Sequence, residues 1–150
     1  ETIDDKEDMQ FADEAFDVLG FSQDEKYEVF KNTACMMHMG NMTKDFVPVG
    51  KEEQAEIKDY ANAEKVAALL GIDSEWMITY FCKPKLKVGT EWVQKGSSCT
   101  GASNSVSGIA RAIYERTFRI VVDKCNETLI DPTMKKVQYI GVFGYCWFRD

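Results

Sequence analysis

The sequence predicts an α+β fold that is mainly helical, with amphipathic helices, one β-hairpin and one buried C-terminal strand. Three observations support this prediction. Apolar residues recur at spacings of three and four from 102 to 129, which is typical of a long amphipathic helix. Residues 85–95 form two short β-rich runs around a Gly-Thr pair. Residues 137–143 are β-rich and nearly uncharged, as expected for a strand buried on both faces.

The composition fits one ordinary domain and argues against a disordered or membrane-spanning protein. The 150 residues are 45% hydrophobic and 12% aromatic, which is enough for a core and excludes wholesale disorder. No run approaches the roughly 18 uninterrupted apolar residues of a transmembrane helix, so no membrane partner is expected. The acidic start at residues 1–8 is not a secretory signal and has no initiator Met, which suggests that the chain begins within a longer protein.

Charge is divided unevenly along the chain. Residues 1–64 hold 17 acidic and 6 basic residues, a net charge of −11, whereas residues 65–150 hold 8 acidic and 12 basic residues, a net charge of +4. We therefore expect the second part to meet an acidic partner and the first part to be solvated. The overall charge of −7 argues against nucleic acid as that partner.

The first quarter of the chain predicts an acidic loop and two helices. Residues 1–9 are expected to form the loop, and residues 11–19 a short helix. Ser22 and Glu25 have the spacing of a capping box, which opens a second helix that runs to about Gly40. The expected buried face of that helix is Val29, Phe30, Thr33, Ala34, Met37 and Asn41, widened by Met36, Met39 and Met42.

The middle of the chain predicts a loop followed by two further helices. Residues 43–60 include Pro48, Gly50 and a charged run, which favours a solvated, mobile surface loop. A third helix is expected over residues 61–70, ended by a glycine. A fourth, capped by residue 73 or 74, is expected to end near residues 83–84, because the residue before a proline avoids the helical region.

The most specific local pattern is the hairpin over residues 85–95. Gly at the first central position suits a type II′ turn. In this register Leu86 faces Val93 and Lys87 faces Trp92. The expected strands are Lys85–Val88 and Glu91–Lys95, with Gly89 and Thr90 in the turn and Lys83, Lys85 and Lys87 on one face. This basic, Trp-bearing hairpin is the one segment whose composition favours an interaction with a partner. The same composition is equally compatible with an ordinary solvated hairpin.

The long helix expected over residues 102–129, with the strand that follows it, forms a scaffold against which the earlier segments are expected to pack. Its expected buried stripe is Val106, Ile109, Ala110, Ile113, Phe118, Val121, Val122, Cys125 and Leu129. Asp131-Pro132 prevents its continuation and leads to the buried strand at 137–143.

The residues offer little catalytic or metal-binding chemistry. The five cysteines are widely spaced, and without a signal peptide they are expected to be free, mostly buried thiols. Cys35 and the single histidine, His38, lie one turn apart but have no second pair with zinc-ligand spacing, so a packed histidine is the favoured interpretation. No Gly-rich phosphate loop occurs. We therefore predict no catalytic, cofactor-binding or metal-binding residue in this chain.

Several segments nevertheless carry a family resemblance. In chain order they are AFDVLGF at 15–21, MHMGNM at 37–42, EEQAE at 52–56, PKLKVGTEWVQKG at 84–96 and KCNETL at 124–129. Together they strongly resemble the motor head of conventional (class II, muscle-type) myosin heavy chain, over about residues 3–143. The resemblance implies a partial motor domain, related in fold to P-loop NTPases. Residues 1–150 would lie in its upper actin-binding subdomain and end at a transducer strand near 137–143.

The resemblance also implies a partner surface. The hairpin is similar to the actin-contacting cardiomyopathy loop, and the residues carried over are Lys85, Lys87, Val88, Gly89, Thr90, Glu91 and Trp92. Lys85 replaces the usual Arg, which keeps the charge but loses the planar fork. The implied partners are the actin filament and the remainder of the heavy chain. The implied setting is the cytoplasmic cytoskeleton or myofibril, within thick filaments.

The end of the chain departs from the family. The family continues into the second nucleotide switch, Asp-Ile-Ala-Gly-Phe-Glu, whereas residues 143–150 read FGYCWFRD. The P-loop and first switch are absent too, so Mg-ATP chemistry would belong to the intact motor and not to this piece. Two hypotheses follow: a fragment of an actin-based, ATP-driven motor, or a stand-alone, non-catalytic interaction domain derived from a myosin gene.

Overall fold

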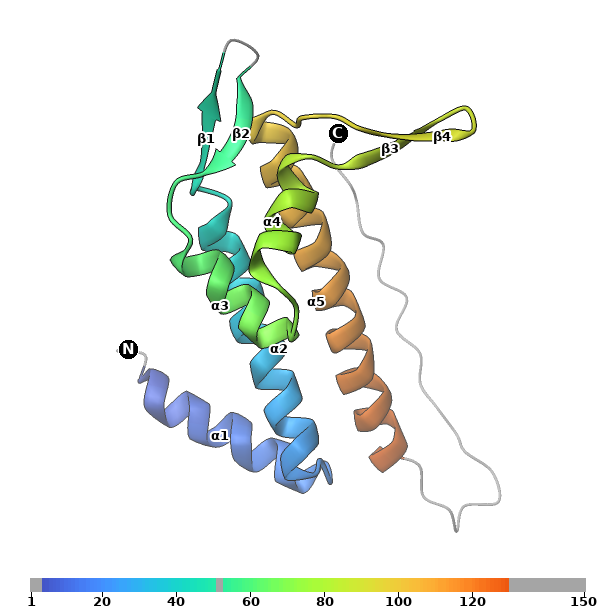
Figure 1. Cartoon of the computed structure of the whole chain (residues 1–150). Coiled ribbons are helices and arrows are strands. Elements are labelled where there is room, and N and C mark those ends of the chain that lie inside the picture. The colour runs from blue at the N-terminus through green and yellow to red at the C-terminus, as the bar shows by residue number, and fades with distance from the viewer. Residues whose placement is uncertain (1–3, 51–52, 130–150) are drawn as a thin grey trace, which may run out of the picture.

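A computed structural model describes residues 4–50 and 53–129 (Figure 1). Two helices, α2 (Gln23–Met42) and α5 (Cys99–Leu129), run side by side. The shorter helices α3 (Ala61–Leu70) and α4 (Ser74–Cys82) pack against them. Two antiparallel hairpins lie at one end of this bundle, and α1 (Asp5–Val18) lies at the other. The structure is therefore mainly helical, as predicted.

The core lies where α2, α3, α4 and α5 meet below the first hairpin, β1 (Phe46–Val49) and β2 (Gln54–Ile57). Its members combine small or flexible residues (Ala, Cys and Met) with the bulkier Val, Ile and Phe, which together fill the space between the helices. They are Cys35, Met39, Met42, Phe46, Ala55, Ile57, Ala63, Val66, Ala67, Met77, Ile78, Phe81, Cys82, Ala102 and Val106.

The second helix begins at the predicted capping box, and its buried face agrees only in part with the prediction. The Ser22 N–H donates to the Glu25 carboxylate at 2.7 Å, and the Glu25 N–H donates to Ser22 Oγ at 3.2 Å. The prediction was wrong for Met37, which is 69% exposed, but correct for Met39 and Met42, which are fully buried together with Cys35. Those three positions face α3 and α5 at once, and periodicity alone cannot identify the neighbours of a helix.

The acidic start is helical, not a loop, so that prediction was wrong from residue 5 onward. Asp4 is the N-cap of α1, and its carboxylate accepts hydrogen bonds from the N–H groups of Lys6 at 3.0 Å and Glu7 at 3.3 Å. Acidic residues fill the first turn, where they complement the positive end of the helix dipole. The charge run that suggested a loop is thus a helix-initiating sequence.

The predicted loop at 43–60 was also wrong, because its two halves pair as β1 and β2. Phe46 pairs with Ile57, and Pro48 pairs with Ala55. Phe46, Ala55 and Ile57 are buried in the core, and this burial of apolar surface stabilises the paired strands. Gly50 has a φ of 77°, which lets the chain turn out of β1.

The remaining helices match their predicted bounds closely. Helix α3 ends at Gly71, whose φ of 69° places it in the left-handed region. Helix α4 is capped by Asp73, whose carboxylate accepts from the Trp76 N–H at 2.7 Å. Helix α5 begins three residues before the predicted start, at Cys99.

Only part of the predicted stripe on α5 is buried. Val106 is enclosed, but Phe118 is 57% exposed and Leu129 is 81% exposed. The C-terminal half of α5 extends beyond α3 and α4, so the apolar residues of that half have fewer neighbours among the described residues. The predicted strand at 137–143, the preceding Asp-Pro break and the divergent end at 143–150 lie outside the described residues.

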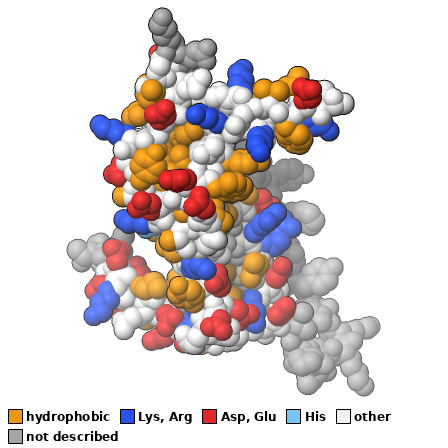
Figure 2. Space-filling view, viewed as in Figure 1, with side chains coloured by type: hydrophobic (Ala, Val, Ile, Leu, Met, Phe, Trp, Pro, Cys, Tyr) orange, Lys and Arg blue, Asp and Glu red, His pale blue; other side chains and the backbone are white. Residues whose placement is uncertain are grey.

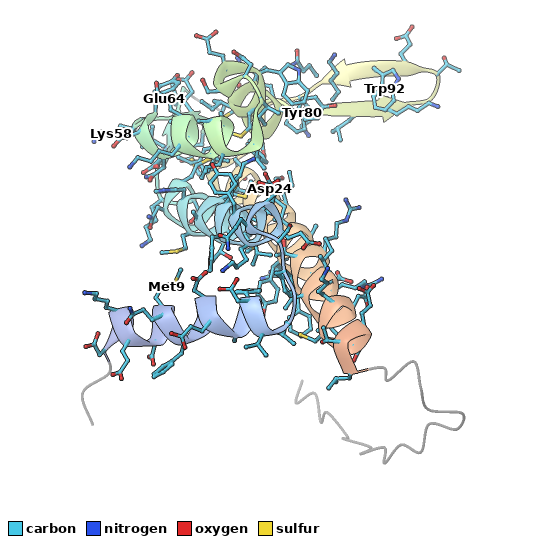
Figure 3. The ribbon with its side chains drawn as sticks, turned by 90° about the horizontal axis from the view of Figure 1, so that it is seen from below. Met9, Asp24, Lys58, Glu64, Tyr80 and Trp92 are labelled. Carbon is cyan, nitrogen blue, oxygen red and sulfur yellow. The ribbon has the colours of Figure 1, made fainter. Side chains whose placement is uncertain are left out.

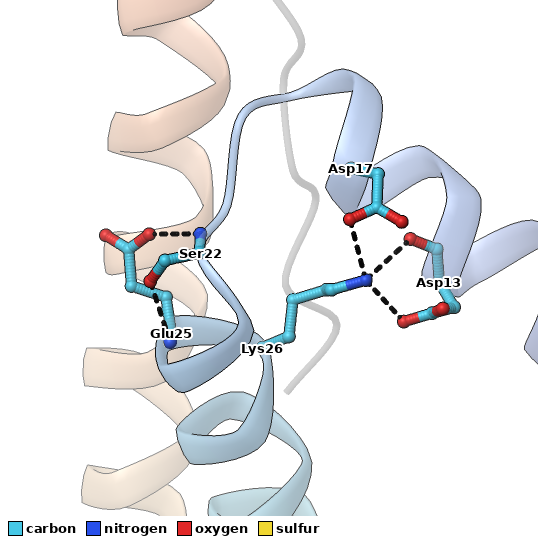
Figure 4. Close-up of polar contacts among 5 residues, drawn as sticks. All are labelled: Asp13, Asp17, Ser22, Glu25 and Lys26. Carbon is cyan, nitrogen blue, oxygen red and sulfur yellow. Dashed lines mark hydrogen bonds and ion pairs between the residues drawn. The ribbon is translucent and has the colours of Figure 1, made fainter.

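An ion-pair cluster attaches α1 to α2 (Figure 4). Lys26, whose side chain is only 3% exposed, places its Nζ 2.7 Å from Asp13 Oδ1 and 2.9 Å from Asp17 Oδ1. Hydrogen bonding to Asp13, and then to Asp17, raises the pKa of Lys26. Because the folded state favours the charged ammonium, the cluster stabilises the fold at neutral pH.

The raised pKa of Lys26 predicts a pH dependence on the alkaline side. Its stabilisation is complete below the unfolded lysine pKa of about 10.4 and is lost as pH rises through the higher folded value. We expect Asp13→Asn plus Asp17→Asn to lower the free energy of unfolding at pH 7 to 9, with a deficit that shrinks above pH ~10.4. Denaturant titrations of both proteins across this range measure the deficit. A deficit that stays constant with pH would mean that the charge on Lys26 is irrelevant to it.

Candidate functional site

The second hairpin, β3 (Lys85–Val88) and β4 (Glu91–Gln94), has the predicted register. Leu86 pairs with Val93, and Lys87 pairs with Trp92. Gly89 has a φ of 63°, whereas Thr90 is not in the positive-φ region. A positive φ at the first central residue alone is the requirement of a type II′ turn.

All eight strand residues are exposed, so neither face of the hairpin is covered by the described chain. Side chains alternate across the two faces. One face carries Lys85, Lys87, Trp92 and Gln94, and the other carries Leu86, Val88, Glu91 and Val93. Trp92 is 67% exposed and Val88 is 64% exposed, so each face of the hairpin presents an apolar side chain to solvent.

The base of the hairpin is attached to the core by backbone hydrogen bonds. The Lys95 N–H donates to the Pro84 carbonyl at 3.2 Å, which continues the pairing of the two arms. The Ser97 N–H donates to the carbonyl of the core residue Cys82 at 2.8 Å. The Ser97 carbonyl accepts from the Ala55 N–H of β2 at 2.8 Å. An isolated two-stranded hairpin is only marginally stable in water, so these bonds fix its direction.

The charge on this hairpin is basic and open to solvent. Lys83, Lys85, Lys87 and Lys95 are exposed, and none of them forms an ion pair with another described residue. Glu91 is the one acidic residue in the strands. Figure 2 shows basic and hydrophobic side chains together over the hairpin and its base. The arrangement suits an acidic partner surface that also offers apolar contacts.

The described residues contain no group of three or more His, Cys, Asp or Glu side chains that could hold a metal ion. His38 lies in α2 with its Nδ1 buried and without a hydrogen-bond partner. Cys35 and Cys82 are free thiols, and burial raises the pKa of each. A raised pKa keeps a thiol protonated at neutral pH, which makes it a poor nucleophile.

Sequence reasoning placed all seven predicted contact residues correctly on one hairpin but missed an aromatic pair beside it. Trp76 and Tyr80 lie one turn apart on α4, 59% and 49% exposed, with ring centroids 5.1 Å apart. The buried residues of that short helix are Met77, Ile78, Phe81 and Cys82. The i, i+4 spacing of the two aromatic residues was present in the sequence, but their exposure follows from which face of α4 is buried.

Comparison with known proteins identifies relatives along almost the whole chain. The family model for the myosin head (motor domain) matches residues 1–149. Myosin-3 of Caenorhabditis briggsae is 41% identical over 149 residues, 99% of this chain and 8% of the relative. Myosin-3 of Caenorhabditis elegans is 40% identical over 149 residues, which are again 99% of this chain and 8% of the relative. Myosin-1 of Caenorhabditis elegans is 39% identical over 147 residues, 98% of this chain and 8% of the relative.

The chain therefore spans about a twelfth of the length of these relatives, 8% in each case. No helix among the described residues is both long enough and apolar enough to cross a membrane.

Proposed function

The chain belongs to the myosin head (motor domain) family, and on this premise we propose that its β3–β4 hairpin contacts actin filaments within an ATP-driven motor. The residues proposed to make the contact are Lys85, Lys87, Val88, Gly89, Thr90, Glu91 and Trp92. The observation that supports the proposal is that all eight strand residues of this basic, Trp-bearing hairpin are exposed, at one tip of the described structure.

The proposal assigns binding and not chemistry to this segment. The sequence has no Gly-rich phosphate loop, which nucleotide binding in such motors requires. Mg-ATP would therefore be bound by other parts of the motor, and the rest of the heavy chain would be the second partner. The setting would be the cytoplasmic actin cytoskeleton or a muscle thick filament.

Electrostatics determines what the hairpin contributes. Actin filaments present an acidic surface, and the lysines around the turn are free to attract it. Attraction between exposed charges mainly raises the association rate and weakens with salt, because the Debye length is only about 8 Å at physiological ionic strength. Each exposed lysine is worth about 0.2–1 kcal/mol in such a contact.

We expect Lys85→Glu plus Lys87→Glu, in a motor head that carries this sequence, to weaken actin binding on the order of tenfold at low salt. The deficit should shrink as salt is added, because screening reduces attraction and repulsion alike. Cosedimentation with filaments across a salt series measures both effects. The affinity of the head for nucleotide, measured by titration, should be nearly unchanged.

A matched control is available on the opposite side of the structure. Lys58 and Lys65 are exposed and form no ion pair with other described residues, and Figure 3 places Lys58 far from Trp92. Lys58→Glu plus Lys65→Glu makes the same change in net charge and should leave actin binding almost intact. If the hairpin reversal also leaves binding intact at low salt, the hairpin is merely solvated and the proposal is wrong.

A further inference from the structure

An apolar hollow of ≈ 400 Å³ lies beside the hairpin, between α4, the end of α3 and α5. Its floor is made by the buried side chains of Met39, Met77 and Phe81. Its rim is made by Trp76, Tyr80 and Ile109, which are 59%, 49% and 44% exposed. No charged side chain lines it.

One side chain, Tyr80, borders both this hollow and the proposed filament contact. Tyr80 also lines a second hollow of ≈ 410 Å³, together with Lys85, Trp92 and Gln94 of the hairpin. Figure 3 shows Tyr80 at the base of the hairpin, on the side toward Trp92. Three aromatic rings on two elements therefore border one surface, with the lysines of β3 at its edge.

The chemistry of this surface fits a macromolecular partner better than solvent. Exposed aromatic side chains that surround a preformed apolar hollow are typical of the central, desolvated part of a protein interface. The hairpin lysines would form the polar rim of such an interface. Because the hollow has no charged lining, burial there would contribute affinity that salt does not screen.

We propose that the filament-contacting surface extends from the hairpin onto α4, and that the Trp76–Tyr80 hollow receives an apolar side chain of the actin filament. This inference rests on the proposed function. It divides the contact into a basic part, which sets the rate of association, and an aromatic part, which sets the rate of dissociation.

The test uses a motor head that carries this sequence, mixed with actin filaments in the absence of nucleotide. We expect Trp76→Ala plus Tyr80→Ala to weaken binding by about tenfold or more at every salt concentration, chiefly through faster dissociation. The salt dependence should match that of the unmodified head. Tyr27→Ala removes a comparably exposed ring (64% for Tyr27) from α2 and should change binding little.

The two variants separate the inference from the proposal on which it rests. If the Trp76–Tyr80 variant binds normally while the Lys85–Lys87 reversal weakens binding, the extension onto α4 is wrong and the hairpin contact stands. If both variants bind normally, the proposed function fails as well. A loss that disappears at high salt would also overturn the inference, because an apolar contact is not screened. Nucleotide affinity and thermal unfolding of each variant verify that the head is folded.

Discussion

Replacing Met42 by Ala should lower the free energy of unfolding by about 2–5 kcal/mol. The side chain is completely enclosed at the end of α2, where that helix meets β1 and α5. Truncation removes apolar contacts and leaves a cavity that the surrounding side chains fill only in part. Chemical denaturation of residues 1–150, followed by far-UV circular dichroism, measures the loss.

Met37 supplies a matched control for this prediction. It has the same side chain on the same helix but is 69% exposed. Met37→Ala should therefore change stability by no more than about 0.5 kcal/mol. Helix propensity favours alanine over methionine at both positions, so equal losses of stability could not arise from it. They would instead contradict the core described above.

The contrast between these two methionines shows what sequence periodicity can and cannot establish. The sequence identified α2 correctly from its capping box. The methionines of this helix are equally apolar, so their chemistry does not reveal which of them are buried. The prediction assigned Met37 to the buried face because apolar spacing does not reveal which neighbours a helix will have. The buried positions are decided by α3 and α5, which arrive from later in the chain.

The sequence predicted helix ends and turns best, because these features are determined by contacts between residues that are close in the chain. Gly71 ends α3 and Asp73 caps α4, each through contacts within a few residues. The type II′ turn at Gly89 likewise determines the register of the second hairpin. All seven candidate contact residues could therefore be placed together from the sequence.

Features that depend on distant partners were missed. Strand β1 contains a proline and β2 overlaps the end of a charged run, and their pairing is stabilised by the entry of Phe46, Ala55 and Ile57 into the core. The surface beside the hairpin was missed for the same reason. Trp76 and Tyr80 became recognisable as an exposed pair only after the packing of α4 was known.

A large effect on stability is also expected at the contact between α5 and the core. Val106 is fully enclosed by apolar neighbours, so Val106→Asp would place a carboxylate where the core offers no positive charge. We expect a loss of about 3–5 kcal/mol at pH 7, the cost typical of an uncompensated buried charge. Ile120→Asp, on the same helix but at a position that is 61% exposed, should be tolerated within about 0.5 kcal/mol.

The pH dependence of this variant distinguishes charge burial from loss of shape. Burial raises the pKa of a carboxyl group, so the folded state would hold its proton while the unfolded state releases it above about pH 3.9. The deficit in unfolding free energy should therefore grow as pH rises from about 4 toward 7. Denaturant titrations of the variant and the unmodified chain at several pH values measure this slope. A deficit that is independent of pH would show that lost packing, and not the buried charge, accounts for the destabilisation.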